Sequence, residues 1–170
     1  MSDMHENNEY TWYSDGCHAI TMLTAIFDEK LLYSRQKGMH EKGGIVLGSM
    51  YEKHDEIIKL AGPHKRDKSG LFSFIRRKEP AQRIIDKAWN RGGGHVVYLG
   101  EWHVHPGCNP IPSTRDRKMI RKAFLTTQME IDHIYMIIFG GDRSCWIGRQ
   151  DNDGLHQLSI LNQSDCEILI

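Results

Sequence analysis

The chain alternates between short apolar runs and longer stretches in which apolar residues recur at helical spacing. The short runs are bounded by glycine, proline or charged residues and predict strands at 19–25, 43–51, 53–62, 71–75, 95–105, 133–140, 143–149 and 155–161. The longer stretches predict helices at 27–38, 78–94 and 113–128. Segment 62–70 holds turn residues and charge without an apolar period, which predicts a loop.

Local signals indicate where these helices begin and end and which faces they bury. Gly38 is expected to close the first helix, and Pro80 lies near the start of the second, which glycines terminate. On the third helix, Ile120, Ala123 and Phe124 share one face and are expected to point inward. Three tryptophans are also expected in the core, namely Trp89, Trp102 and Trp146.

A chain of 170 residues with hairpins and helix-crossed strands predicts a single α/β domain over 1–170, with a mixed sheet flanked by helices. Lys plus Arg and Asp plus Glu both number 22, so composition gives no general attraction to nucleic acid or to a membrane. The first residues lack a signal-peptide pattern, and no apolar run reaches the ~20 residues that span a bilayer. These features predict a cytoplasmic protein with neither nucleic-acid nor membrane partners.

Cysteine usage gives no sign of a disulfide framework. The four cysteines lie far apart without a Cys-x-x-Cys pair, so thiols are expected at Cys17, Cys108, Cys145 and Cys166. Cys108 follows the histidine pair described next, where it is either an idle thiol or a thiolate that approaches a metal.

The segment His-Val-His-Pro at 103–106 has the pattern of half a metal site. Residues two apart on a strand point to the same side, so His103 and His105 can present two imidazoles to one point in space. Trp102 alternates with them and is expected to face the opposite side. Two imidazoles converging from one strand are typical ligands of zinc.

The following helix offers a third ligand. Asp116 lies three residues after Ser113, so a carboxylate and a hydroxyl share one helix face in the first turn. Two imidazoles and one carboxylate leave the fourth tetrahedral position open, as in catalytic zinc sites. Zinc-activated water needs a base, and Glu41 at the start of strand 43–51 is a candidate. Taken alone, Ser113 also fits a helix cap, and Glu41 a solvated loop charge.

Together these segments resemble the motif of the JAMM metallopeptidases, also called MPN-type: Glu-x-Gly-Gly-x-x-Leu-Gly at 41–48, His-x-His-Pro at 103–106 and Ser-x-x-Asp at 113–116. The resemblance implies a cytidine-deaminase-like sheet and one Zn²⁺ per chain. It also implies a role for each of five residues: zinc ligands His103, His105 and Asp116, general acid and base Glu41, and oxyanion-binding Ser113.

A narrower similarity covers segments 62–77, 98–106 and 112–116, which look like a bacterial JAMM subgroup from mobile elements and anti-phage operons. That subgroup includes the isopeptidases that accompany cGAS-like nucleotidyltransferases in CBASS systems. It implies an enzyme that removes proteins conjugated to the C-terminus of such a nucleotidyltransferase. A zinc beside the Glu41 strand also predicts a neighbouring sheet edge, on which an extended C-terminal tail adds as a strand.

Other functions fit parts of the pattern. A metal-free scaffold of the same fold would lack one or more of the ligands that this chain retains. A nucleotide deaminase would need a Cys-x-x-Cys pair, which the sequence lacks. A deubiquitinase-like or carrier-protein-processing peptidase stays open. The basic residues between 65 and 78 are either a solvated loop or a docking surface for an acidic partner.

Overall fold

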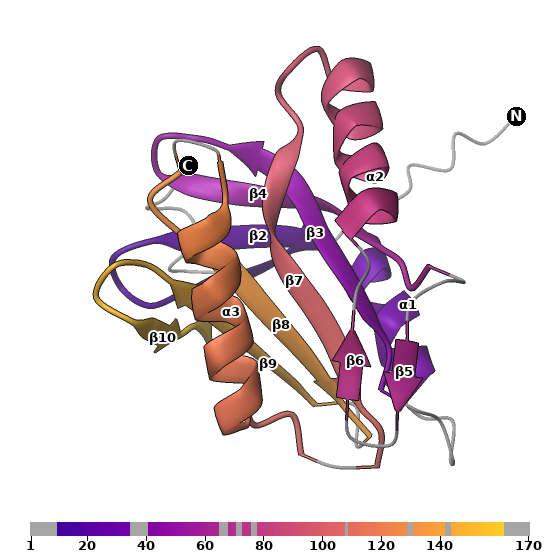
Figure 1. Cartoon of the computed structure of the whole chain (residues 1–170). Helices are drawn as coiled ribbons and strands as arrows, with labels where there is room; N and C mark the ends of the chain where they lie inside the picture. Colours follow the sequence, from indigo (N-terminus) through magenta and orange to yellow (C-terminus); the bar gives the residue numbers. More distant parts are fainter. Residues whose placement is uncertain are drawn as a thin grey trace, which may run out of the picture.

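The computed structural model describes residues 10–34, 41–64, 68–70, 73–75, 78–107, 109–128, 131–141 and 144–161. These residues form a nine-stranded mixed sheet, a two-stranded ribbon and the helices α1 (Thr24–Ser34), α2 (Lys78–Arg91) and α3 (Thr114–Thr126) (Figure 1). In spatial order, the large sheet contains β10 (Leu155–Gln157), β9 (Cys145–Gln150), β8 (Ile134–Gly140), β7 (Val97–His105), β3 (Gly43–Met50), β4 (His54–Ala61), β2 (Ala19–Leu23), β1 (Tyr10–Ser14) and β11 (Ser159–Ile160). The ribbon pairs β5 (Lys68–Gly70) with β6 (Ser73–Ile75).

Strand pairing at the centre of the large sheet determines where the chain crosses over. β3 runs antiparallel to both β4 and β7, whereas β7 with β8 and β2 with β4 are parallel pairs. Parallel neighbours need a crossover connection, and α3 supplies it between β7 and β8. Since α3 is the element that follows β7, its first turn comes only a short loop after the end of this strand.

Each face of the large sheet carries its own apolar core. On one face, α1 packs over buried residues that include Trp102 and Tyr135. On the other face, α2 and α3 cover a core that includes Ile45, Ile120 and Ile138 (Figure 1). Because side chains alternate along a strand, odd-numbered residues of β7 from 101 to 105 face α2 and α3.

One short segment near residue 158 covers both edges of the large sheet. β10 pairs with β9 at one edge and β11 pairs with β1 at the other, although only Leu158 separates β10 from β11 along the chain. Since consecutive Cα atoms are about 3.8 Å apart, the two edges must come close together. The sheet is therefore strongly curved.

Most of the predicted elements are confirmed, and so is the α/β class with a mixed sheet and flanking helices. The hairpin predicted from 43–51 and 53–62 is the antiparallel pair β3 and β4. Helix α1 begins at Thr24, inside the strand predicted for 19–25, because pairing with β1 ends at Leu23. Gly38, predicted to close this helix, lies outside the described residues.

The short strands are where the predictions are wrong. Part of the loop predicted at 62–70 is strand β5, and the single strand predicted at 155–161 is divided between β10 and β11. β1 was not predicted at all. Strands this short are defined by their pairing partners, which lie far away in sequence or across a turn, and not by their own apolar pattern.

Two of the three tryptophans predicted in the core are there. Trp102 and Trp146 are buried, but Trp89 is 48% exposed at the end of α2. Trp89 keeps the helical spacing of the partly buried Ile85, yet its ring lies against Gly94, beyond the end of the helix. Cys17 and Cys145 are free thiols, as predicted.

The remaining predictions concern a free sheet edge, the other cysteines, the basic segment and membrane-spanning segments. The sheet edge predicted beside the Glu41 strand is wrong for the large sheet, because β3 has a paired neighbour on each side. The remaining cysteines and the side chains of the basic segment from 65 to 78 lie outside the described residues. Within the described part of the chain, none of the helices has the length and apolar character needed to cross a bilayer.

Candidate metal centre

The last residues of β7 present two imidazoles on the face that α2 and α3 cover. His103 and His105 point to the same side, and their Nε2 atoms are 3.1 Å apart. Trp102, between Glu101 and His103, faces the other core and donates from Nε1 to the backbone oxygen of Ala61 at 2.9 Å. The structure therefore brings together the two histidines that the motif pairs.

The first turn of α3 adds a carboxylate to this pair. Asp116 Oδ1 lies 3.1 Å from His103 Nε2, and Oδ2 lies 3.5 Å from His105 Nε2. Tetrahedral zinc with ligands at 2.0–2.1 Å spaces its donor atoms about 3.3 Å apart, close to these distances. The donor set and its spacing fit one zinc ion, with the fourth position left for water or substrate.

Ser113 holds Asp116 in place through a reciprocal capping box. The backbone N–H of Ser113 donates to Asp116 Oδ2 at 2.6 Å, and the backbone N–H of Asp116 donates to Ser113 Oγ at 3.2 Å. Oγ acts here as an acceptor, so this bond does not use the hydroxyl proton. The cap and a role as proton donor to substrate are therefore compatible.

The electrostatics of the cluster favour binding of a cation. Burial alone raises the pKa of Asp116, but hydrogen bonds from His103 and His105 bring it well below its ordinary range. Burial lowers the pKa of His105, yet its hydrogen bond with Asp116 outweighs this and raises the pKa overall. An ionised carboxylate faces two imidazoles here, and a divalent cation can replace the protons they share.

Glu41 reaches the same place from the neighbouring strand. β3 pairs with β7 so that Gly43 lies opposite His103, and Glu41 is two residues before Gly43. Glu41, His103 and Asp116 line one cavity of about 370 Å³. Burial raises the pKa of Glu41 above its ordinary value of 4.5, although the nearby imidazoles of His103 and His105 act in the opposite direction. Such a carboxyl is suited to take up and return a proton.

Two glycines of the 41–48 motif allow this approach. A Cβ atom at Gly43 would lie 2.4 Å from the backbone oxygen of Trp102, and one at Gly44 would lie 1.8 Å from that of Ala61. Neither position has room for a side chain. The motif therefore needs glycine here for packing between β4 and β7.

The cavity also contains residues that the sequence did not single out. Glu101 shares a strand face with His103, is buried, and accepts a hydrogen bond from the Tyr98 hydroxyl at 2.7 Å. Arg115 and Lys122 of α3 line the same cavity. The alternation of side chains along β7 places Glu101 on the same face as His103, so the sequence could have pointed to Glu101 as a cavity residue. Nothing in the sequence pattern points to Arg115 and Lys122, which reach the cavity because of where α3 packs.

Comparison with known proteins places this arrangement in a family. Residues 24–154 match the family described as prokaryotic homologs of the JAB domain, and the chain belongs to that family. A protein of Desulfitobacterium hafniense, known from a solution structure, has a similar fold with a TM-score of 0.58 and 20% identity, over 81% of this chain and 88% of that one.

Several curated proteins are similar in sequence. A protein of Vibrio cholerae named CD-NTase/cGAS isopeptidase is 26% identical over 66% of this chain and 69% of its own length. One of the same name from Pseudomonas aeruginosa is 38% identical over 45% of this chain and 49% of its own. A probable metalloprotease of Sinorhizobium fredii is 29% identical over 44% of this chain and 46% of its own. The family and these relatives make the chain a hydrolase, as predicted.

Proposed function

We propose that this protein is a zinc-dependent isopeptidase that removes proteins conjugated to the C-terminus of a cGAS-like nucleotidyltransferase. The observation that carries the proposal is the convergence of His103, His105 and Asp116 on one point beside Glu41. Relatives named CD-NTase/cGAS isopeptidase support the substrate.

The proposed chemistry divides the work between the metal and the protein. His103, His105 and Asp116 would hold the zinc, which would supply Lewis acidity at this site. The carboxylate of Glu41 takes the proton of the attacking water and later delivers it to the leaving nitrogen. The Ser113 hydroxyl donates to the developing oxyanion, a contact whose loss typically costs about 3 kcal/mol.

The same geometry disfavours a metal-free scaffold. A scaffold has no need to keep three donor atoms converging on one point, with a second carboxyl, that of Glu41, beside them and its pKa raised. Among the described residues β3 is paired on both sides, so in this proposal the substrate tail reaches the site through the cavity and not as an added strand of β3.

The substrate is tested with a fusion placed after the C-terminal residue of a cGAS-like nucleotidyltransferase. The zinc-loaded protein is incubated with this fusion, with ubiquitin chains and with casein fragments, and products are read by intact mass. Cleavage at the fusion junction and little cleavage elsewhere is expected. Cleavage of ubiquitin chains or generic peptides with an uncut fusion would contradict this substrate and favour a deubiquitinase-like enzyme.

The metal assignment is tested separately by removing a ligand. Asp116→Ala should lose activity and the zinc of this centre together, since two imidazoles alone hold the ion too weakly. Arg117→Ala, one residue further along α3 on its exposed surface, is the matched control and should keep both. Elemental analysis showing the same zinc content in Asp116→Ala as in the wild type would refute the ligand set.

A further inference from the structure

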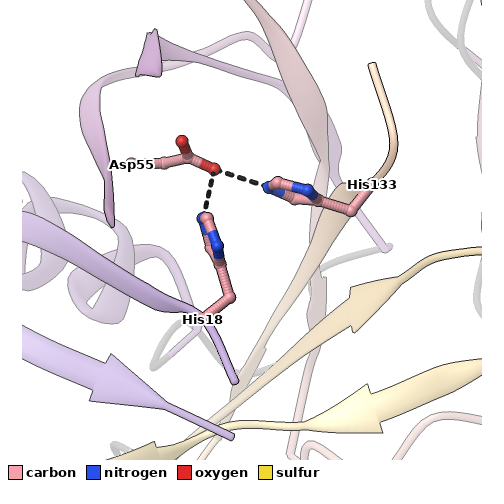
Figure 2. Close-up of side chains that lie close together, drawn as sticks. All are labelled: His18, Asp55 and His133. Carbon is pink, nitrogen blue, oxygen red and sulfur yellow. Dashed lines mark hydrogen bonds and ion pairs between the residues drawn. The ribbon is translucent and has the colours of Figure 1, made fainter. Parts of the chain in front are cut away.

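A second group of two histidines and one aspartate, the His18 cluster (His18, Asp55 and His133), lies on the sheet face opposite to the candidate metal centre. His18 precedes β2, Asp55 is the second residue of β4, and His133 precedes β8 (Figure 2). Asp55 and His133 share their strand faces with Ile57 and Tyr135, both in the core beside α1. Three segments far apart in sequence therefore meet here.

Both imidazoles direct Nε2 at one carboxylate oxygen. Asp55 Oδ2 lies 3.2 Å from His18 Nε2 and 2.7 Å from His133 Nε2. The first distance is already near the spacing of about 3.3 Å between donor atoms around tetrahedral zinc, and the second must lengthen by about 0.6 Å. Movement of this size is within reach of a side-chain adjustment, because His133 lies outside the regular strand.

The neighbours of the Asp55 carboxylate satisfy only one of its two oxygens. Asp55 is fully buried, and its Oδ1 has no hydrogen-bond partner within the described part of the chain. Its other oxygen, Oδ2, is contacted by His133, His18 and Tyr135. An ionised carboxylate with an unpaired buried oxygen costs free energy, which a bound cation would offset.

Contacts with Asp132 and Tyr135 hold the side chains of His133 and Asp55 in orientations that suit metal ligands. His133 Nδ1 lies 2.5 Å from Asp132 Oδ1, so a carboxylate holds the far side of the ring and aims Nε2 inward. Histidines that bind metals are commonly oriented by such a carboxylate. The Tyr135 hydroxyl donates to Asp55 Oδ2 at 2.8 Å and fixes the remaining orientation.

We propose that His18, Asp55 and His133 form a second metal site, which binds a divalent transition ion of the zinc class and ties β2, β4 and β8 together. Two imidazoles select zinc, cobalt or nickel over magnesium and calcium, which prefer oxygen ligands. The His18 side chain is 20% exposed and gives the ion a path, whereas Asp55 is 0% exposed. The enclosure indicates a structural ion and not a catalytic one.

The test uses the full chain, stripped with a chelator, reloaded with Zn²⁺ and desalted. Elemental analysis should find about two zinc ions in the wild type and about one in either His18→Ala or Asp116→Ala. His156→Ala is the matched control, because His156 contacts Asp151 at 3.1 Å outside either three-ligand cluster, and it should keep about two. Wild-type zinc content in folded His18→Ala would overturn the second site.

A second measurement leaves the His18 cluster unaltered. In the Asp116→Ala background, Co²⁺ alone should give a visible d–d absorption band, and Zn²⁺ alone should raise the melting temperature reversibly. Absence of both responses would overturn the proposal even if His18→Ala does not fold. Neither readout depends on peptidase activity, so the second site and the proposed function can fail independently.

Discussion

The candidate metal centre and the His18 cluster have the same donor set, but one opens on a cavity and the other is enclosed. At the first, Glu41 stands beside the ligands in about 370 Å³ of open space. At the His18 cluster, Asp55 is fully buried. The Tyr135 hydroxyl contacts Asp55, and Asp132 contacts His133. The comparison indicates that the donor set alone does not make a hydrolytic centre, which also needs an accessible fourth position and a proton-transferring group.

The largest effect expected from this comparison is on turnover. Glu41→Gln should lower kcat by about 10² to 10⁴, roughly 3 to 5 kcal/mol, because it removes the group that we propose moves the proton. The variant should keep its zinc and its melting temperature, since Glu41 is not among the three ligands. Cleavage kinetics, elemental analysis and a thermal melt on one preparation measure kcat, zinc content and melting temperature. A fully active Glu41→Gln enzyme would show that Glu41 is only a loop charge.

An effect of similar size, but on stability, is expected at the His18 cluster. Asp55→Asn should lower the free energy of unfolding by about 3 to 5 kcal/mol, because it breaks a buried pair between a carboxylate and imidazoles. Urea denaturation in the presence of a chelator isolates this loss from any metal effect. Asp132→Asn is the control, because its side chain is 86% exposed, and its loss should be under about 1 kcal/mol. Equal losses in both variants would contradict the role of burial.

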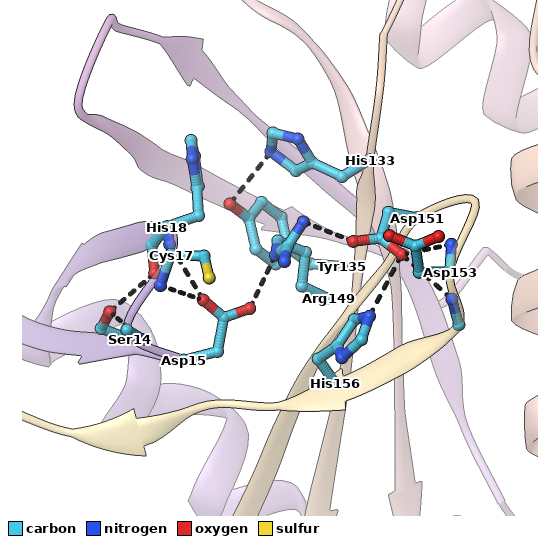
Figure 3. A network of polar contacts seen from close by, with 12 residues as sticks. Ser14, Asp15, Cys17, His18, His133, Tyr135, Arg149, Asp151, Asp153 and His156 are labelled. Carbon is cyan, nitrogen blue, oxygen red and sulfur yellow. Dashed lines mark hydrogen bonds and ion pairs between the residues drawn. The ribbon is translucent and has the colours of Figure 1, made fainter.

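The smallest effect on stability is expected in a network of ion pairs that lies beside the His18 cluster (Figure 3). Unlike the two clusters, this network does not have three metal-binding side chains converging on one point among the described residues. Arg149 contacts Asp15 at 2.8 Å and Asp151 at 2.7 Å, and Asp151 also accepts from the backbone N–H groups of Asp153 and Gly154. Burial raises the pKa of Asp151, but these contacts bring it below its ordinary value of 3.8.

A lowered pKa gives this network a defined pH dependence. The stability contributed by Asp151 is complete above pH 3.8 and is lost as pH falls through the lower pKa of the folded state. Asp151→Asn should therefore cost about 1 kcal/mol near neutral pH, and the difference from the wild type should shrink in acid. Urea denaturation from neutral pH to about pH 3 measures this. A difference that grows toward acid would contradict the direction of the shift.

The two clusters also differ in how far the sequence predicts them. Around the candidate metal centre, His103 and His105 lie on one strand and Asp116 follows in the next helix, so strand and helix periods suffice to bring them together. Glu41 is separated from them by some sixty residues, and only resemblance to a family motif pointed to it. Its place depends on pairing of β3 with β7, which local patterns do not specify.

The His18 cluster has no such local signal. His18, Asp55 and His133 come from three strand ends with no common spacing, and each looks alone like an ordinary polar residue next to an apolar run. His133 is buried, although it directly precedes a strand. Parallel pairing of β2 with β4 brings the first two together. Long-range topology therefore decides what sequence periodicity leaves open.

The pairing of β10 and β11 with opposite edges of the large sheet bears on self-association. An unpaired edge strand exposes a row of backbone N–H and C=O groups that can recruit another chain. Here residues 155–161 cover both edges, with Leu158 N–H bonded to Ile147 O and Leu161 N–H to Trp12 O, each at 2.9 Å. Detachment of this one short segment would therefore expose the edges of β9 and β1 at once.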